Sequence, residues 1–130
     1  TTAEKEGFGA FMMDKPDVVA AMVRAMVADA AVTVPVFVKM RVFPERAATL
    51  SFVHMLEGAG ASLITVHGRT RANTVHRGPC DWETIGACVG AVRIPVNSSY
   101  RADDLSGPHL PAPPSEGSQP LNLALKRCGP

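Results

Sequence analysis

The chain has 130 residues and a mass of 13.7 kDa, which suits one domain and is too small for two. With 13 Lys and Arg against 12 Asp and Glu, the formal charge is +1, which excludes a polybasic nucleic-acid-binding chain and an acidic tail. No apolar stretch approaches the ~20 residues of a membrane span, and the three cysteines include no CxxC pair, which argues against a disulfide scaffold or a zinc site.

Helical and strand-like patterns alternate along the first part of the chain. Asp14 and Pro16 suit a helix start, and apolar residues three and four positions apart then predict one apolar face through Ala30. Residues 34–40 are apolar at consecutive positions, as in a parallel strand covered on both faces. A second helix is predicted over about residues 45–59, ending at Gly60 as a C-cap, and is followed by a strand over 63–66.

A third helix and a further strand are predicted before the composition changes. Asp81 suits an N-cap, with Trp82, Ile85 and Val89 facing inward, and residues 94–96 open another strand. Residues 98–130 contain six prolines, five serines and three glycines without an apolar period. We therefore predict a folded domain over 1–97 and a disordered tail over 98–130.

The spacing of the predicted strands indicates the architecture. Residues 31–36 (AVTVPV) resemble residues 91–96 (AVRIPV), and one further strand lies between them, which makes about 30 residues per strand-plus-helix unit. A parallel barrel of eight units takes ~250 residues, or ~31 per unit. The pattern predicts an α/β fold with about three units of a (β/α)₈ barrel or of a doubly wound sheet. A small three-layer α/β domain, complete in itself, is the alternative.

Cationic side chains follow two of the predicted strands, where parallel sheets bind ligands. Lys39 and Arg41 close the first strand, and the second strand ends in His67, which precedes Arg69 and Arg71. The same loop continues to His76 and Arg77, and no acidic residue lies between Glu57 and Asp81. This loop is interpreted either as an anion-binding face or as a solvated basic loop.

Lys39 and His67 have functional and structural interpretations of similar weight. A lysine at a strand end either meets a phosphate or a cofactor's negative charge, or snorkels to water. His67 either contacts a ligand or caps its strand. If the strand continues, Arg41 points to the same side as Lys39. Cys80 and Cys88 are interpreted as small buried hydrophobic residues without a nucleophilic role.

Several sequence blocks together resemble the tRNA-dihydrouridine synthases, in particular the eukaryotic branch that acts on the D-loop. The blocks are GFGAFMMDKP (7–16), VKMRVFP (38–44), MLEGAGA (55–61), LITVHGRTR (63–71) and DWETI (81–85). Their order and spacing match over residues 7–96, roughly the middle of that family's catalytic barrel. The resemblance implies an FMN-bearing (β/α)₈ barrel that reduces the 5,6 double bond of a uracil in tRNA, with NADPH reducing the flavin.

The resemblance also implies roles for individual residues. Lys39 matches the family's flavin-contacting lysine, and His67 matches the histidine at the flavin and uracil pocket. Arg41, Arg69 and Arg71 fall, more loosely, where such enzymes bring positive charge to the FMN phosphate or to the tRNA backbone. No residue of this chain matches the family's catalytic cysteine, which would lie before Thr1, and no metal site is expected.

The departures from the family pattern shape the remaining expectations. After Val96 the family's Ala-Asn-Gly segment is replaced by NSSY and the proline-rich tail. We interpret the chain as a central piece of such a synthase, inactive alone, with exposed sheet edges that favour self-association. A non-catalytic isoform that binds RNA or a partner, and another FMN-dependent barrel oxidoreductase, are the alternatives. The cysteine content and the lack of a secretory signal predict a cytoplasmic location, with the nucleus as the alternative.

Overall fold

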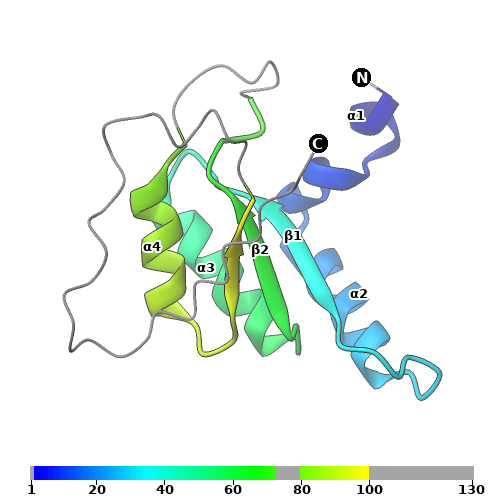
Figure 1. Cartoon of the computed structure of the whole chain (residues 1–130). Coiled ribbons are helices and arrows are strands. Elements are labelled where there is room, and N and C mark those ends of the chain that lie inside the picture. The colour runs from blue at the N-terminus through cyan, green and yellow to red at the C-terminus, as the bar shows by residue number, and fades with distance from the viewer. Residues whose placement is uncertain (1, 73–79, 100–130) are drawn as a thin grey trace, which may run out of the picture.

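A three-stranded parallel sheet with helices on one face organises the chain (Figure 1). The computed structural model describes residues 2–72 and 80–99. The elements are α1 (Thr2–Glu6), the 3₁₀ helix η1 (Gly9–Asp14), α2 (Pro16–Ala28), β1 (Phe37–Arg41), α3 (Arg46–Gly58), β2 (Leu63–His67), α4 (Trp82–Ala91) and β3 (Val96–Ser98). The strand order is β1-β2-β3, so α3 and α4 each join two neighbouring parallel strands. The two βαβ units confirm the predicted α/β class.

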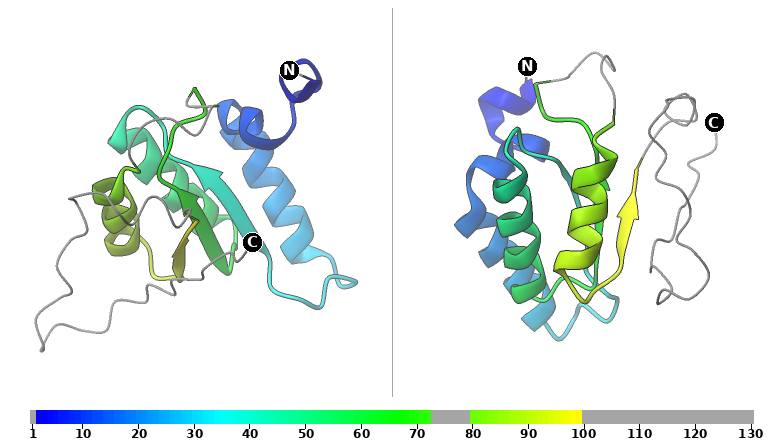
Figure 2. Two further views of the ribbon diagram at one scale, coloured as in Figure 1. Left: turned by 45° about the horizontal axis from the view of Figure 1, so that its top comes forward. Right: turned by 90° about the vertical axis from the view of Figure 1, so that its left-hand side faces the viewer.

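Helices α2, α3 and α4 form a single layer behind the sheet, as Figure 2 shows in its right-hand view. The core lies between the two layers, and its fully buried apolar side chains include Val53, Leu56, Ile64, Val66 and Cys88. On the other face of β1, Phe37 is 62% exposed and Lys39 is also exposed. The expectation of a β1 covered on both faces is therefore wrong for the part of the chain that the structure describes. Crossovers of one hand place their helices on one side of a sheet, so α3 and α4 cover the same face.

The start of α2 differs from the prediction at one residue. The helix begins at Pro16, as expected, but Lys15 is its N-cap residue and no side chain caps it. Asp14 instead accepts a hydrogen bond from Arg71, far along the chain. Ala20 and Val23 are the buried residues of α2. The predicted apolar face is therefore wrong over most of its length, because Met22, Met26 and Val27 are 51%, 41% and 47% exposed and the helix ends at Ala28.

The turn between α3 and β2 requires glycine. Gly60 has φ +99°, and a Cβ on it would lie 3.2 Å from Cγ1 of Val27 on α2. The predicted C-terminal signal is confirmed, with Ala59 as the cap residue just before it. Because α2 and α3 pack together at this turn, the glycine serves both the chain reversal and the contact between helices.

Helix α4 begins as predicted and leads into β3. Asp81 accepts hydrogen bonds from the backbone N–H of Thr84 at 2.8 Å and from its hydroxyl at 2.7 Å. Ile85 is buried, whereas Trp82 and Val89 are half-buried. Strand β3 extends through Ser98, and the N–H of Ser99 donates to Val66 O, so the sheet passes the predicted boundary at residue 97. The rest of the predicted tail, 100–130, lies outside the described residues.

Two short amino-terminal elements have no counterpart in the sequence predictions. Helix α1 and η1 are joined by Gly7 and Gly9, whose φ angles are +67° and +62°. Both values lie in the left-handed region that favours glycine, so the GFG sequence makes a turn here. Residues of η1 contact both α2 and β1. Among the helices that the structure describes, none is long and apolar enough to cross a membrane.

Candidate functional site

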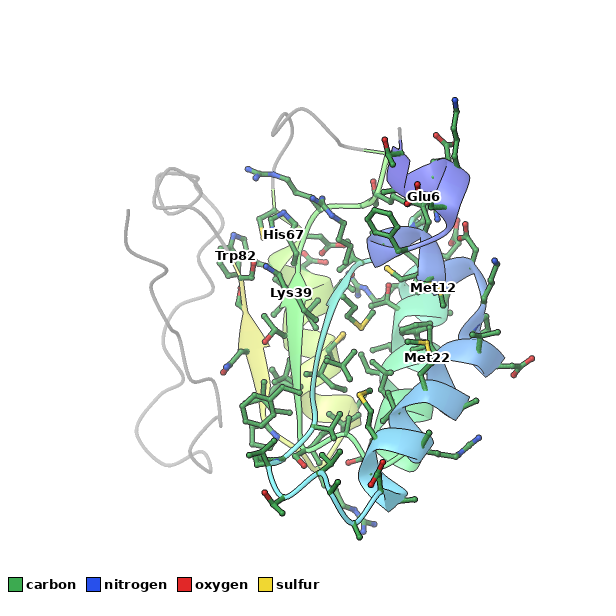
Figure 3. All side chains as sticks on the ribbon, turned by 90° about the vertical axis from the view of Figure 1, so that its right-hand side faces the viewer. Glu6, Met12, Met22, Lys39, His67 and Trp82 are labelled. Carbon is green, nitrogen blue, oxygen red and sulfur yellow. The ribbon has the colours of Figure 1, made fainter. Side chains whose placement is uncertain are left out.

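Polar side chains share the open face of the sheet. Lys39 of β1 pairs with Thr65 of β2, which pairs with Asn97 of β3. Two residues further along the strands, Arg41 pairs with His67. Neighbouring residues in a parallel sheet point to the same side, so these five side chains form two adjacent rows opposite the helices. Figure 3 shows Lys39 and His67 on neighbouring strands.

The expected orientation of Arg41 follows from this register. Strand β1 continues through Arg41, two residues beyond Lys39, so both side chains lie on one face, as predicted. The guanidinium Nη1 donates a hydrogen bond to the backbone carbonyl of Thr70 at 3.3 Å. Arg41 thus joins the end of β1 to the segment that follows β2.

His67 lies in a half-buried position at the end of β2. Its Nδ1 lies 3.4 Å from Oγ of Ser99, just beyond β3. Burial lowers the pKa of the imidazole, and the positive charges of Arg41 and Arg69 lower it further. The neutral ring, which carries one N–H donor and one acceptor nitrogen, is therefore favoured at neutral pH. With Nδ1 facing Ser99, Nε2 is the ring nitrogen that can contact a ligand.

The predicted arginine cluster is divided by the structure into different environments. Arg69 is only 6% exposed. The Arg71 guanidinium lies 4.8 Å from the centroid of the Phe11 ring and pairs with the carboxylate of Asp14. These contacts connect the segment after β2 to η1. His76 and Arg77, the other members of the predicted basic loop, lie outside the described residues.

Thr65 was not identified from the sequence as a site residue, and Asn97 was noted only as a remnant of the family's Ala-Asn-Gly segment. The Oδ1 atom of Asn97 is buried and accepts no hydrogen bond from the described part of the chain. Both residues occupy the same face as Lys39, but the strand period alone does not select them, because the pairing of the strands must also be known. The register between distant strands is what a single sequence does not contain.

A glycine next to His67 allows the strand end and α4 to approach closely. A Cβ on Gly68 would lie 2.3 Å from Sγ of Cys80 and 2.9 Å from Cδ1 of Ile85. The carbonyl of Gly68 accepts a 2.7 Å hydrogen bond from the N–H of Asp81. Gly68 therefore fixes the position of β2, and with it His67, against the start of α4.

The buried cysteine Cys88 has the surroundings of a core residue rather than of a nucleophile. Cys88 is buried in the core, and burial raises the pKa of its thiol to about 11, with the charge of Asp81 as a smaller cause. The thiol is therefore protonated and inert at neutral pH. Across residues 2–72 and 80–99, no group of three or more His, Cys, Asp or Glu side chains could hold a metal ion.

Comparison with known proteins identifies the family. The model of the dihydrouridine synthase (Dus) family matches residues 1–98. A tRNA-dihydrouridine(16/17) synthase-like protein of Rattus norvegicus, whose name specifies NAD(P)(+), is 41% identical over 95 residues. A probable tRNA-dihydrouridine synthase 1 of a Synechocystis strain is 38% identical over 94 residues.

These alignments cover much of this chain and little of the relatives. They include 72% of this chain and 21% of the rat protein, and 71% of this chain and 26% of the Synechocystis protein. The chain thus spans about a fifth to a quarter of the length of these relatives. The family match extends over the whole sheet and the helices packed on it. The chain belongs to the dihydrouridine synthase (Dus) family.

Proposed function

We propose that this chain supplies part of the active site of a flavin-dependent enzyme that reduces uridine to dihydrouridine in tRNA. The proposal concerns the protein that carries this segment within a complete (β/α)₈ barrel. The observation that carries it is the shared open face, on which Lys39 and His67 occupy adjacent rows of a parallel sheet. In a closed barrel this face lies inside and the strand ends form the mouth, where barrel enzymes bind substrates.

The side chains on the open face fit a flavin chemically. A flavin ring edge presents carbonyl oxygens that accept hydrogen bonds and one imide N–H that donates. The row of Lys39, Thr65 and Asn97 offers an ammonium donor, a hydroxyl and an amide. The buried Oδ1 of Asn97, which accepts no hydrogen bond from the described residues, matches the need for an acceptor. We propose FMN as the group bound, with NADPH as the reductant of the complete enzyme.

Each residue has a distinct part in this proposal. Bound FMN supplies the hydride that reduces the uracil ring. The ammonium of Lys39 stabilises negative charge that develops on the ring edge it contacts. His67 stays neutral, because burial and the nearby arginines lower its pKa, and it can donate or accept a hydrogen bond through Nε2. Arg41 holds the neighbouring segment through Thr70 and adds positive charge at the rim.

Flavin retention by the 130-residue chain tests this assignment. The purified protein is incubated with FMN, free ligand is removed, and the visible absorbance of bound flavin is measured. We expect the wild-type chain to retain flavin and Lys39→Met to lose most of it. Lys5→Met is the matched control, because Lys5 is exposed on α1 and has no place on the open face.

The outcomes are distinguishable when folding is followed by circular dichroism on the same samples. A folded wild-type chain that retains no flavin would contradict FMN binding by this chain. Equal flavin loss in both lysine variants would contradict the role of Lys39. In the complete barrel, Lys39→Met should reduce dihydrouridine formation in tRNA, measured by nucleoside mass spectrometry, and Lys5→Met should not.

A further inference from the structure

A cleft of about 390 Å³ lies between η1 and the segments that follow β1 and β2. Its walls include Phe11 from η1, Phe43 and Pro44 after β1, and Thr70 and Arg71 after β2. The volume is within the ~300–1,000 Å³ of small-molecule sites. None of these residues except Arg71 was singled out from the sequence.

Hydrogen bonds connect two walls of the cleft to the ends of β1 and β2. Arg41 on the open face donates to the carbonyl of Thr70, whose residue also lines the cleft. The N–H of Val42, another lining residue, donates to the carbonyl of His67 at 3.0 Å. The cleft therefore adjoins the strand ends, so that a base held at His67 would have the cleft beside it.

The charges of the lining favour a neutral ring over a phosphate. Glu4 and Asp14 contribute two carboxylates and Arg71 one guanidinium, so the charged lining residues sum to one negative charge. The guanidinium of Arg71 is already paired with Asp14. The lining residues therefore offer a phosphate no net positive charge, whereas an amino group on a base could donate to a carboxylate.

The remaining lining surface suits stacking. Arg71 lies over the Phe11 ring, and this pair presents planar surfaces next to the apolar Phe43 and Pro44. Unpaired bases of RNA stack on aromatic rings and on guanidinium planes in this way. We infer that the cleft binds an amino-bearing nucleobase, a purine by its larger stacking area, that neighbours the target uridine. This inference rests on the proposed function and concerns a second base of the same RNA.

Nucleoside titration of the isotope-labelled 130-residue chain, followed by backbone amide NMR, tests the inference. Adenosine should shift the amide signals of Phe11, Thr70 and Arg71. Purine riboside, which lacks the amino group, should bind several-fold more weakly, and ribose 5-phosphate should leave these signals in place. Adenosine that shifts none of them, or ribose 5-phosphate that shifts them as strongly, would overturn the assignment.

A pair of matched variants locates the stacking surface. Phe11→Leu should weaken adenosine binding about tenfold, because the base loses its stacking contact with the aromatic ring. Phe37→Leu is the control, because Phe37 is the first residue of β1 and lines no part of the cleft. Equal affinity of both variants would contradict stacking on Phe11. If Phe11→Leu does not fold, the comparison of adenosine with purine riboside on the wild-type chain still decides the question.

Flavin retention measured on the same sample separates this inference from the proposed function. A chain that retains FMN but shows no adenosine shifts at the cleft retains its proposed function and loses the second-base site. A folded chain that binds adenosine in the cleft but retains no FMN contradicts the proposed flavin site alone.

Discussion

At the scale of single residues, Gly68 lies where a strand end meets the start of a helix and leaves no room for a methyl group. A Cβ there would overlap Sγ of Cys80 and crowd Ile85. We expect Gly68→Ala to lower the free energy of unfolding by ~1–3 kcal/mol, as overpacked sites do. Urea denaturation followed by circular dichroism measures the change.

The same substitution at another glycine provides the control. Gly86 is exposed in α4, and a Cβ on it would meet nothing within 4 Å. Gly86→Ala should therefore raise the free energy of unfolding by ~0.5–1 kcal/mol, because alanine loses less entropy in a helix. Similar effects of the two substitutions would show that the close approach at Gly68 does not constrain the fold.

The lowered pKa of His67 predicts a pH dependence of stability. Because the folded state disfavours the charged ring, the unfolded state binds more protons as the pH falls below 6.5, the ordinary pKa of an imidazole. The stabilising effect of the neutral ring is complete above that pH and is lost as the pH falls towards the lower pKa of the folded state. We expect His67→Gln to flatten this part of the curve of unfolding free energy against pH.

Thermal or urea unfolding between pH 7 and pH 5 is the measurement. The matched variant is His54→Gln, since His54 is exposed on α3. A curve that stays unchanged in His67→Gln would contradict the assignment of the pH dependence to this ring. Arg41, Arg69 and Lys39 are the cations that act on it.

The alternation of side chains along a strand predicted some site residues correctly and could not predict the surroundings of others. The alternation of side chains placed Lys39 and Arg41 on one face, and the register confirms it. The arginines after β2 were treated as one cluster, but Arg69 is buried and Arg71 pairs with Asp14. The environment of Arg71 depends on contacts with Phe11 and Asp14 of η1, which no local pattern in the sequence revealed. The functional roles proposed for the predicted site residues stay predictions; these residues are Lys39, Arg41, His67, Arg69 and Arg71.

At the scale of elements, the N-cap of α4 links three parts of the chain. Asp81 caps the helix through Thr84, whose hydroxyl also accepts from Nε of Arg46 at the start of α3. We expect Asp81→Ala to lower the free energy of unfolding by ~0.5–2 kcal/mol, the usual range for a lost cap. Chemical denaturation monitored by Trp82 fluorescence measures it.

Asp29→Ala is the comparison for that measurement. Asp29 is also at a helix end, but its carboxylate accepts only an exposed 2.9 Å bond from the N–H of Ala31 among the described interactions. Its loss should cost less than the loss of Asp81. The reverse order would show that the α3–α4 connection through Thr84 contributes little to stability.

Element boundaries were predictable where a signal was local. Asp81 and Gly60 are such signals, and both ends lie where the sequence predicts them. Helix α1 and η1 were missed, because they are short and their turn uses two glycines without an apolar period. The interpretation of β1 as buried on both faces failed for another reason. The strand is apolar at consecutive positions, but the helices of the described residues cover only one of its faces.

At the scale of the whole molecule, an open face and two edge strands predict self-association. Strands β1 and β3 are the edges of the sheet, and Phe37 is exposed on its open face. Unpaired strand edges next to apolar surface promote pairing between chains. We expect the sedimentation coefficient of the chain to rise with concentration. Phe37→Lys should reduce this rise by placing charge on the surface, whereas Phe37→Leu should preserve most of it.

The hydrogen bond between Gly68 and Asp81 holds together the two ends of the segment that joins β2 to α4. The 2.7 Å bond between these residues joins the end of β2 to the start of α4 and brings together two points that are thirteen residues apart in the chain. Lengthening a loop whose ends are already joined adds little entropic cost. Insertions or deletions between the two residues can therefore accumulate without displacing His67. We therefore expect the length of this segment to vary among relatives while the histidine keeps its place.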